Sequence, residues 1–273
     1  MLDCGEGTQR QLLRSGMGFR RLNAVLLTHG HLDHILGLGG IVSTFARWEA
    51  VEHMQIIGGR WAVRRVRDLM NVVIRTGDIK VDIQYVEIQS GMVYESEHYS
   101  VSAFEIQHRG PDCYGYVFEE KSRRPLLAEK ADALGMPFGP ERKRLVAGES
   151  ITLPGERVIQ PDDVLGAEVR GTKLVWVGDA ARTNEILFQA QNADALVIEA
   201  TFLDSERVEA EQYGHLTAAQ SAALARDAHA RQLLLHHISR RYHPKQIEDE
   251  ARAIFPESIV VNDLQRFTIS ANR

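Results

Sequence analysis

The chain has 273 residues, of which 44% are hydrophobic and 25% charged, a composition typical of a folded globular protein rather than a disordered one. Its net charge of −5 excludes a globally basic surface, so a polyanion such as RNA would have to meet local basic patches. The two cysteines, Cys4 and Cys113, suggest no disulfide framework and favour a reducing, cytoplasmic setting. No apolar run reaches the ~20 residues needed to cross a membrane, and no signal peptide precedes the first motif.

The first residues predict the end of a strand followed by a helix. Leu2 and Asp3 have the pattern of a strand end, and Gly5 and Gly7 predict a turn into a helix that reaches about Ser15. A domain seldom starts at the end of a strand. We therefore expect the chain to lack its natural beginning.

The segment Thr28 to His34 holds the densest group of metal-competent side chains. It follows the apolar run 24–27, a predicted buried strand, and contains His29, His31, Asp33 and His34. A spacing of two places His29 and His31 on the same side of extended backbone, and the following turn brings Asp33 and His34 round. Imidazole and carboxylate suit zinc or manganese, with no thiolate to close the site. A merely polar or pH-sensitive loop is the alternative, but this density favours a metal site.

The next 85 residues predict a mixture of helices and strands. Amphipathic or apolar patterns predict helices over 35–48 and 60–76, and strands over 55–58, 80–88, 92–94, 99–107 and 115–119. His108 follows the fourth of these strands. A lone histidine is more often an ordinary surface residue, so sequence spacing alone does not assign it.

Residues 121–164 are rich in charge, proline and glycine, and they predict an insertion. The part from Lys121 to Arg144 has seven Lys or Arg against three Asp or Glu, and only a short helix over 129–134 is indicated. A plain surface loop is one interpretation. The other is a protruding, flexible arm that grips a phosphate backbone, with Arg142, Lys143 and Arg144 as candidate contacts.

From residue 172 onward the pattern alternates between strand and helix. Strands are predicted over 173–178, 194–199, 232–235 and 258–261, and helices over 183–191, 217–228 and 244–254. Three of the strands end in Asp179, in Glu199 and in the pair His236 and His237. Because open α/β sheets place their sites at the carboxyl ends of strands, these residues point to one site. Adjacent histidines face opposite ways on extended backbone, so at most one of the pair is a ligand.

Taken together, these motifs resemble the ribonuclease Z family, the tRNA 3′-processing endonucleases of the metallo-β-lactamase superfamily. The matching stretches occur in the family's order: DCGEGTQ at 3–9, the histidine motif at 29–34, GMPFGP at 135–140, DDVLG at 162–166, GD at 178–179, EATF at 199–202, His215 with Thr217, and HISRRY at 237–242. Histidine-rich metal motifs are shared across the superfamily. The combination with DCGEGTQ, EATF and HISRRY is much more specific.

The resemblance implies a fold, a cofactor and residue roles. The fold would be a four-layer αββα sandwich, an α/β (α+β) architecture forming one domain over 1–273 with the arm at 121–164 inserted in it. Two Zn²⁺ ions, or Mn²⁺, would be held by seven residues: His29, His31 and His108 on one ion, Asp33, His34 and His237 on the other, and Asp179 on both. Asp33 would also position or deprotonate the attacking water. His215, paired with Glu199, would stabilise or protonate the leaving oxygen.

The implied function is removal of the 3′ trailer from precursor tRNA by a cytoplasmic homodimer whose arm holds the tRNA body. Two alternatives stay open: a di-metal phosphodiesterase or other metallo-hydrolase with a small substrate, and a non-catalytic RNA-binding relative. The sequence also departs from the family pattern. It has THGHLDH where many relatives have THLHGDH, which exchanges only the spacers between ligands, and the strands that precede DCGEGTQ in relatives are missing.

Overall fold

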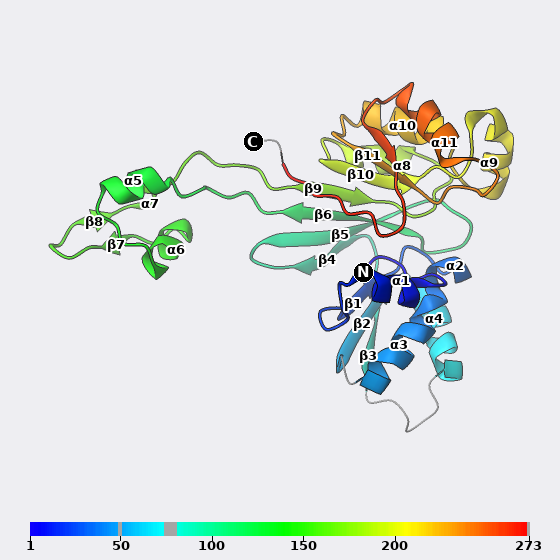
Figure 1. Ribbon diagram of the computed structural model, residues 1–273, viewed down its shortest axis with the longest axis horizontal. Helices are drawn as coiled ribbons and strands as arrows, with labels where there is room; N and C mark the ends of the chain where they lie inside the picture. Colours follow the sequence, from blue (N-terminus) through cyan, green and yellow to red (C-terminus); the bar gives the residue numbers. More distant parts are fainter. Residues whose placement is uncertain (49–50, 74–80, 272–273) are drawn as a thin grey trace. The chain divides into compact units, whose positions relative to one another are not determined.

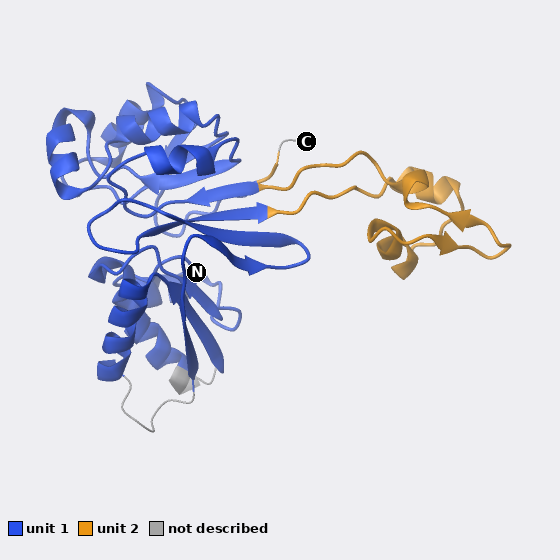
Figure 2. Cartoon of the chain, turned by 180° about the vertical axis from the view of Figure 1, so that it is seen from behind, with its two compact units in different colours: residues 1–119, 173–269 blue, residues 120–172, 270–273 orange. Residues whose placement is uncertain are grey.

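The computed structural model describes residues 1–48, 51–73 and 81–271. The chain divides into two compact units, one formed by residues 1–119 and 173–269 and the other by residues 120–172 and 270–273 (Figure 2). The first unit contains both large sheets and every predicted site residue. The second contains the whole of the charged segment 121–164.

The N-terminal part of the first unit is a three-stranded parallel sheet flanked by helices (Figure 1). Its strands, in order, are β1 (Ala24–Leu26), β2 (His53–Gly58) and β3 (Asp82–Glu87). The helices beside it are α1 (Thr8–Ser15), α3 (Gly37–Trp48) and α4 (Arg60–Val73). Buried residues of α3 and α4, among them Leu38, Ile41 and Val66, pack with Val25 and Ile56 of the sheet to form one core.

The remainder of the first unit is a seven-stranded mixed sheet covered by helices. Its strands, in spatial order, are β12 (Ser258–Val260), β11 (Leu233–His236), β10 (Ala195–Glu199), β9 (Lys173–Trp176), β6 (Tyr114–Glu120), β5 (Tyr99–Glu105) and β4 (Gly91–Glu95). The strands β12 to β9 are parallel, and β9 pairs antiparallel with β6. The covering helices are α8 (Asn184–Ala190), α9 (Arg207–Tyr213), α10 (Ala218–Asp227) and α11 (Pro244–Arg252) (Figure 1).

The two sheets meet through a separate apolar seam. Val101, Ala103 and Tyr116 from the large sheet are buried there, with Leu26 of the small sheet packed against them. The hydroxyl of the fully buried Tyr116 donates a hydrogen bond to the Leu27 carbonyl over 2.7 Å, which ties the two sheets together. The result is the four-layer αββα arrangement that the sequence predicts.

Most predicted elements are present, with small shifts at their ends. The predicted helix over 35–48 is two helices, because the short α2 (Leu32–Ile35) ends before α3 begins at Gly37. A Cβ atom at Gly37 would lie 2.0 Å from the Gly5 carbonyl oxygen, so the chain passes too close here for any larger residue. The last residues of the predicted helix over 60–76, and the first of the strand over 80–88, lie outside the described residues.

The sequence failed to predict one helical segment of the first unit. A 3₁₀ turn (η1, Asp204–Glu206) and α9 follow β10, where no element was expected. Only Ala210 of α9 is buried, so this helix lacks the apolar stripe on which sequence prediction depends. The backbone of its following residue, Gly214, contacts the site described below.

The second unit is more ordered than its sequence suggests. It contains α5 (Ala128–Ala133), α6 (Pro140–Val146), α7 (Pro161–Val164) and a hairpin of β7 (Ile151–Thr152) and β8 (Val158–Ile159). Its small core consists of Ala131, Met136, Leu145, Ile151, Ile159, Val164 and Leu165. Such short elements bury one or two residues each, which gives no periodic pattern to detect.

Candidate metal centre

All seven predicted ligands lie together at the ends of strands from both sheets. His29 and His31 follow β1, and Asp33 and His34 lie in α2. From the large sheet come His108 after β5, Asp179 after β9 and His237 after β11. These strand ends therefore converge, as the sequence analysis expects.

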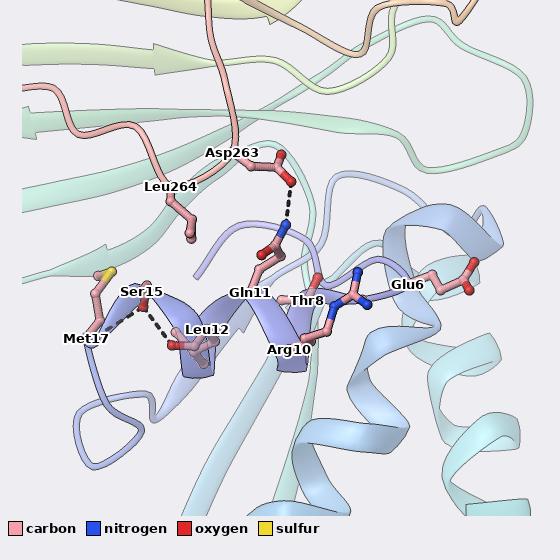
Figure 3. A pocket seen from close by; sticks show the side chains of 10 residues that line it. Glu6, Thr8, Arg10, Gln11, Leu12, Ser15, Met17, Asp263 and Leu264 are labelled. Atoms are coloured by element: carbon pink, nitrogen blue, oxygen red, sulfur yellow. Dashed lines mark hydrogen bonds between the residues drawn. The ribbon is translucent and has the colours of Figure 1, made fainter.

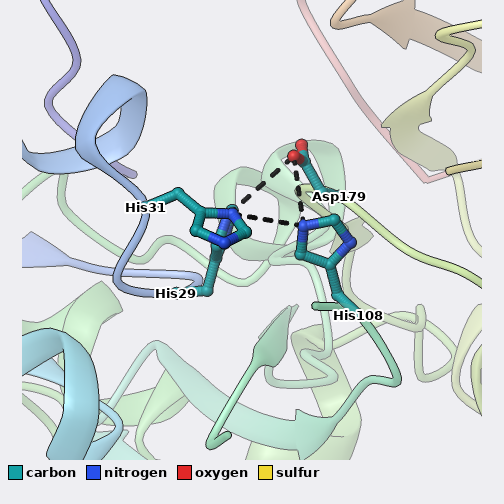
Figure 4. Close-up of side chains that lie close together, drawn as sticks. All are labelled: His29, His31, His108 and Asp179. Carbon is teal, nitrogen blue, oxygen red and sulfur yellow. Dashed lines mark hydrogen bonds and ion pairs between the residues drawn. The ribbon is translucent and has the colours of Figure 1, made fainter. Parts of the chain in front are cut away.

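Three imidazoles and one carboxylate form the first group of donors. Figure 4 shows His29, His31, His108 and Asp179 pointing toward one another, and their donor atoms all lie within 4.8 Å of each other. The Nδ1 atom of His31 is 2.9 Å from His29 Nε2 and 3.3 Å from His108 Nε2. Asp179 Oδ2 lies 3.6 Å from His108 Nε2 and 3.9 Å from His29 Nε2. This is the donor set of a small divalent cation.

A second group faces the other oxygen of the same aspartate. Asp179 Oδ1 lies 3.5 Å from Nε2 of both His34 and His237. Asp33 Oδ2 closes this group, at 3.6 Å from each of the same two nitrogens. The two oxygens of Asp179 therefore face two separate donor groups, which is the arrangement of a bridging ligand.

The buried Asp179 carboxylate provides a test of whether a cation fits here. The residue is only 5% exposed, and its Oδ1 accepts no hydrogen bond from the described residues. An ionised buried carboxylate with an unsatisfied oxygen is costly unless a cation or further donor occupies the space beside it. The donor set and this unsatisfied oxygen both fit a divalent metal.

Protonation favours metal binding at some of these residues and opposes it at others. Against the effect of burial, the neighbouring carboxylates of Asp179 and Asp3 raise the pKa of His34 to about 10, and that of Asp33 raises the pKa of His237, so a metal would have to displace their protons. Burial lowers the pKa of His29 to about 2, so its imidazole is neutral and its lone pair available. The neighbouring His237 lowers the pKa of Asp33 to about 2. Burial opposes ionisation of Asp179, but the imidazoles of His34 and His237 keep its pKa below the ordinary range. Both carboxylates are therefore charged at neutral pH.

Asp3 orients one of the ligands from the N-terminal segment. Its Oδ2 lies 2.8 Å from His34 Nδ1 and accepts a hydrogen bond from the Thr28 hydroxyl, while its Oδ1 accepts from the Thr28 backbone amide. With Nδ1 thus occupied, His34 presents Nε2 to the site. Carboxylate partners of this kind fix the tautomer and direction of a ligating imidazole. The DCGEGTQ motif therefore contributes directly to the site.

Other ligands have similar partners that the sequence analysis missed. His108 Nδ1 lies 2.8 Å from the Gly214 carbonyl, and His237 Nδ1 lies 2.9 Å from the Thr201 hydroxyl. Gly214 could not have been found, because it follows the unpredicted helix α9. Thr201 lies within EATF, two residues after Glu199. That spacing is the sequence signal that could have identified Thr201 as a residue supporting the site.

Glu199 and His215 form the predicted pair beside the ligands. His215 Nδ1 lies 3.0 Å from Glu199 Oε1 and 3.9 Å from Asp179 Oδ2. Glu199 is fully buried and accepts further hydrogen bonds from the Ala180 and Leu216 amides and from Thr201. The carboxylate thus holds His215 in place and is itself held by three other donors.

His236 and a cavity beside α1 both lie outside the candidate metal centre. His236 Nε2 is 2.8 Å from the Val177 carbonyl and its ring stacks on Trp176, so of the adjacent pair only His237 faces the ligands. A cavity of about 540 Å³ lies beside α1 and residues 263–264, where Gln11 contacts Asp263 (Figure 3). None of its lining residues is a predicted metal ligand.

Comparisons with known proteins agree with this geometry. The Beta-lactamase superfamily domain matches residues 1–127 and 145–238. A protein named Ribonuclease Z from Bradyrhizobium sp. (strain ORS 278) is 42% identical over 98% of this chain and 89% of its own length. One of the same name from Archaeoglobus fulgidus is 35% identical over 99% and 88%, respectively.

Solved structures give the same fold at lower sequence identity. The short form of human tRNase Z superposes with a TM-score of 0.65 at 20% identity, covering 98% of this chain and 87% of that one. The metallo-beta-lactamase fold protein YhfI from Bacillus subtilis also has a TM-score of 0.65, at 16% identity over 96% and 83%. From the superfamily domain match and the identity to curated relatives, we conclude that this chain belongs to the ribonuclease Z family of the metallo-β-lactamase superfamily.

Proposed function

We propose that the chain is an endoribonuclease that removes the 3′ trailer from precursor tRNA, with two divalent ions, Zn²⁺ or Mn²⁺, in the centre around Asp179. The observation that carries the proposal is the position of Asp179, whose two oxygens face two separate donor groups. The relatives named Ribonuclease Z match this chain over nearly its whole length, which supports the substrate class. Family membership also confirms the prediction of a metal-dependent hydrolase.

The ligand assignment follows the two groups. His29, His31 and His108 would hold one ion, Asp33, His34 and His237 the other, and Asp179 both. Two ions in such a site clamp a phosphodiester and lower the pKa of bound water enough to supply a nucleophile at neutral pH.

Asp33 is placed to handle the attacking water. Its side chain is 65% exposed, unlike the 3% of Asp179, so the carboxylate borders the space that solvent and substrate enter. It is ionised at neutral pH and retains acceptor capacity beside His237. In the proposed reaction Asp33 orients the water and accepts its proton.

His215 would complete the reaction as the proton donor. Glu199 engages Nδ1, which leaves Nε2 as the nitrogen available to the substrate. Water attacks the phosphorus, the bond from phosphorus to the tRNA 3′ oxygen breaks, and His215 protonates that oxygen. The products are a tRNA with a 3′-hydroxyl and a trailer with a 5′-phosphate.

The second unit would hold the body of the tRNA. Residues 120–172 have nine Lys or Arg and nine Asp or Glu, so this segment has no net charge and any phosphate contact must come from individual cations. Arg142 is committed internally, because its guanidinium contacts Asp132 and the carbonyls of Met136 and Pro137. Lys130 and Lys143 are exposed and form no ion pair within the described part of the chain. They are the better candidates.

The protein would act in the cytoplasm as a homodimer, the assembly that the family resemblance implies. Among the residues that the structure describes, no helix is long and apolar enough to cross a membrane. The second unit of each protomer would then be available to a tRNA bound in either site.

We expect the purified chain, loaded with Zn²⁺ or Mn²⁺, to cut a precursor tRNA next to its discriminator base. The cleavage should stop when a chelator removes the metal and return when metal is added back. Mapping the ends of the products on a sequencing gel gives the position of cleavage and tests for the 3′-hydroxyl on the tRNA. A metal-loaded chain that leaves this RNA intact but hydrolyses a small chromogenic diester would contradict the tRNA substrate.

Replacing His215 by Ala should lower kcat by about 10²- to 10⁴-fold, because the leaving oxygen loses its acid. Metal content and RNA affinity should stay unchanged, since His215 is assigned to neither ion. The matched control is His243→Ala, which removes an exposed histidine that caps α11. Single-turnover cleavage and metal analysis of both variants decide the matter, and a His215→Ala enzyme with normal kcat would disprove the proton-donor role.

Replacing Lys130 and Lys143 by Gln should weaken tRNA binding and reduce the slope of log affinity against log salt by roughly 1.5. Hydrolysis of a small chromogenic diester should be unaffected, because such a substrate makes no contact outside the centre. Lys245→Gln removes an exposed lysine paired with Asp249 in α11 and serves as the control. Equal losses on both substrates would refute a role in holding tRNA.

A further inference from the structure

We infer that Trp61 is a positioning residue of the metal centre: its indole lies between the two loops that carry His31 and His108, and it requires glycine at position 30. The inference rests on the metal site proposed above. It concerns how this chain holds that site in shape.

Trp61, at the start of α4, contacts both loops. A Cβ atom at Gly30 would lie 2.9 Å from Cδ2 and Cε3 of the indole, and one at Gly110 would lie 2.6 Å from Cζ3 and 2.9 Å from Cη2. Real Cβ atoms do not approach this closely, so the six-membered ring fills the space on both sides. The His31 ring also meets the indole edge-on, with centroids 5.4 Å apart.

Arg65 secures the indole against the first loop. Its guanidinium carbon lies 5.6 Å from the centre of the Trp61 ring, and its Nη1 donates a hydrogen bond of 2.8 Å to the Gly30 carbonyl. One residue of α4 therefore holds both the indole and the backbone between His29 and His31. The fully buried Ala62 and Val66 anchor the helix in the core independently of Trp61.

Gly30 and Trp61 form a matched pair. The indole from α4 takes the space beside position 30, whereas Leu32, the spacer after His31, is 49% exposed.

The consequence for function is the geometry of the first donor group. His31 Nδ1 approaches both His29 Nε2 and His108 Nε2, so it is the atom through which the two loops meet. Metal affinity depends on donors held within a few tenths of an ångström by their surroundings. Displacing Trp61 from either loop would move His31 relative to His108.

A double-mutant cycle tests the pair, with Zn²⁺ affinity measured by competition against a chromophoric chelator. In the natural background, Gly30→Ala should weaken zinc binding by roughly 10- to 100-fold, because the new methyl group pushes the indole and the His31 loop apart. Trp61→Leu should also weaken binding, since the loops lose their support. In the Trp61→Leu background, however, Gly30→Ala should cost clearly less than in the natural one, because the obstructing ring is gone and the nearest remaining atom, the Ala62 Cα, lies at 3.1 Å.

Two controls keep the cycle interpretable. Met70→Ala removes a buried side chain more than two turns along α4 from Trp61, in the same core, and should leave zinc affinity unchanged. Thermal unfolding of each metal-free variant reports folding, and Trp61→Phe replaces Trp61→Leu in the cycle if the latter does not fold. A Gly30→Ala penalty that is equal in both backgrounds, or absent in the natural one, would overturn the inference. An unsubstituted chain that binds no zinc would instead refute the metal site itself.

Discussion

The structure depends above all on one buried carboxylate. Asp179 sits between two groups of donors, each drawn from both sheets, and one of its oxygens accepts no hydrogen bond from the described residues. Such a group is tolerated only if the surrounding charge compensates it. The imidazoles of His34, His237, His29 and His108 approach it from all sides but leave the unsatisfied oxygen. The fold therefore prepares a site for cations rather than a closed polar core.

Residues from segments far apart in the sequence hold the candidate ligands in position. Asp3 holds His34 from the first residues of the chain, and Thr201 and Gly214 hold His237 and His108 from the loops around α9. Trp61 fills the space between two ligand loops from α4. These contacts bring loops from both sheets to one point, so the geometry of the site depends on the whole sandwich.

The sequence predicted most of the candidate ligands because their chemistry is local and dense. Four of the seven lie within six residues, and Asp179 and His237 follow apolar strands whose ends must meet. His108, without such context, needed the family resemblance. Among the supporting residues, Thr201 had a signal in its spacing from Glu199, but Gly214 and Trp61 could not be predicted, because they act through three-dimensional neighbours. The same limit applies to Arg142, whose charge in the sequence suggested a phosphate contact but whose side chain is used within its own unit.

The most direct test of the account is the number of metal ions that Asp179 supports. The measurement is zinc per chain by mass spectrometry after exhaustive dialysis, for the natural chain and for Asp179→Asn, which keeps the shape and removes the charge. We predict two ions per natural chain and fewer than one in the variant, because both donor groups share this carboxylate. Two ions retained by a folded Asp179→Asn protein, or at most one in the natural chain, would contradict the account.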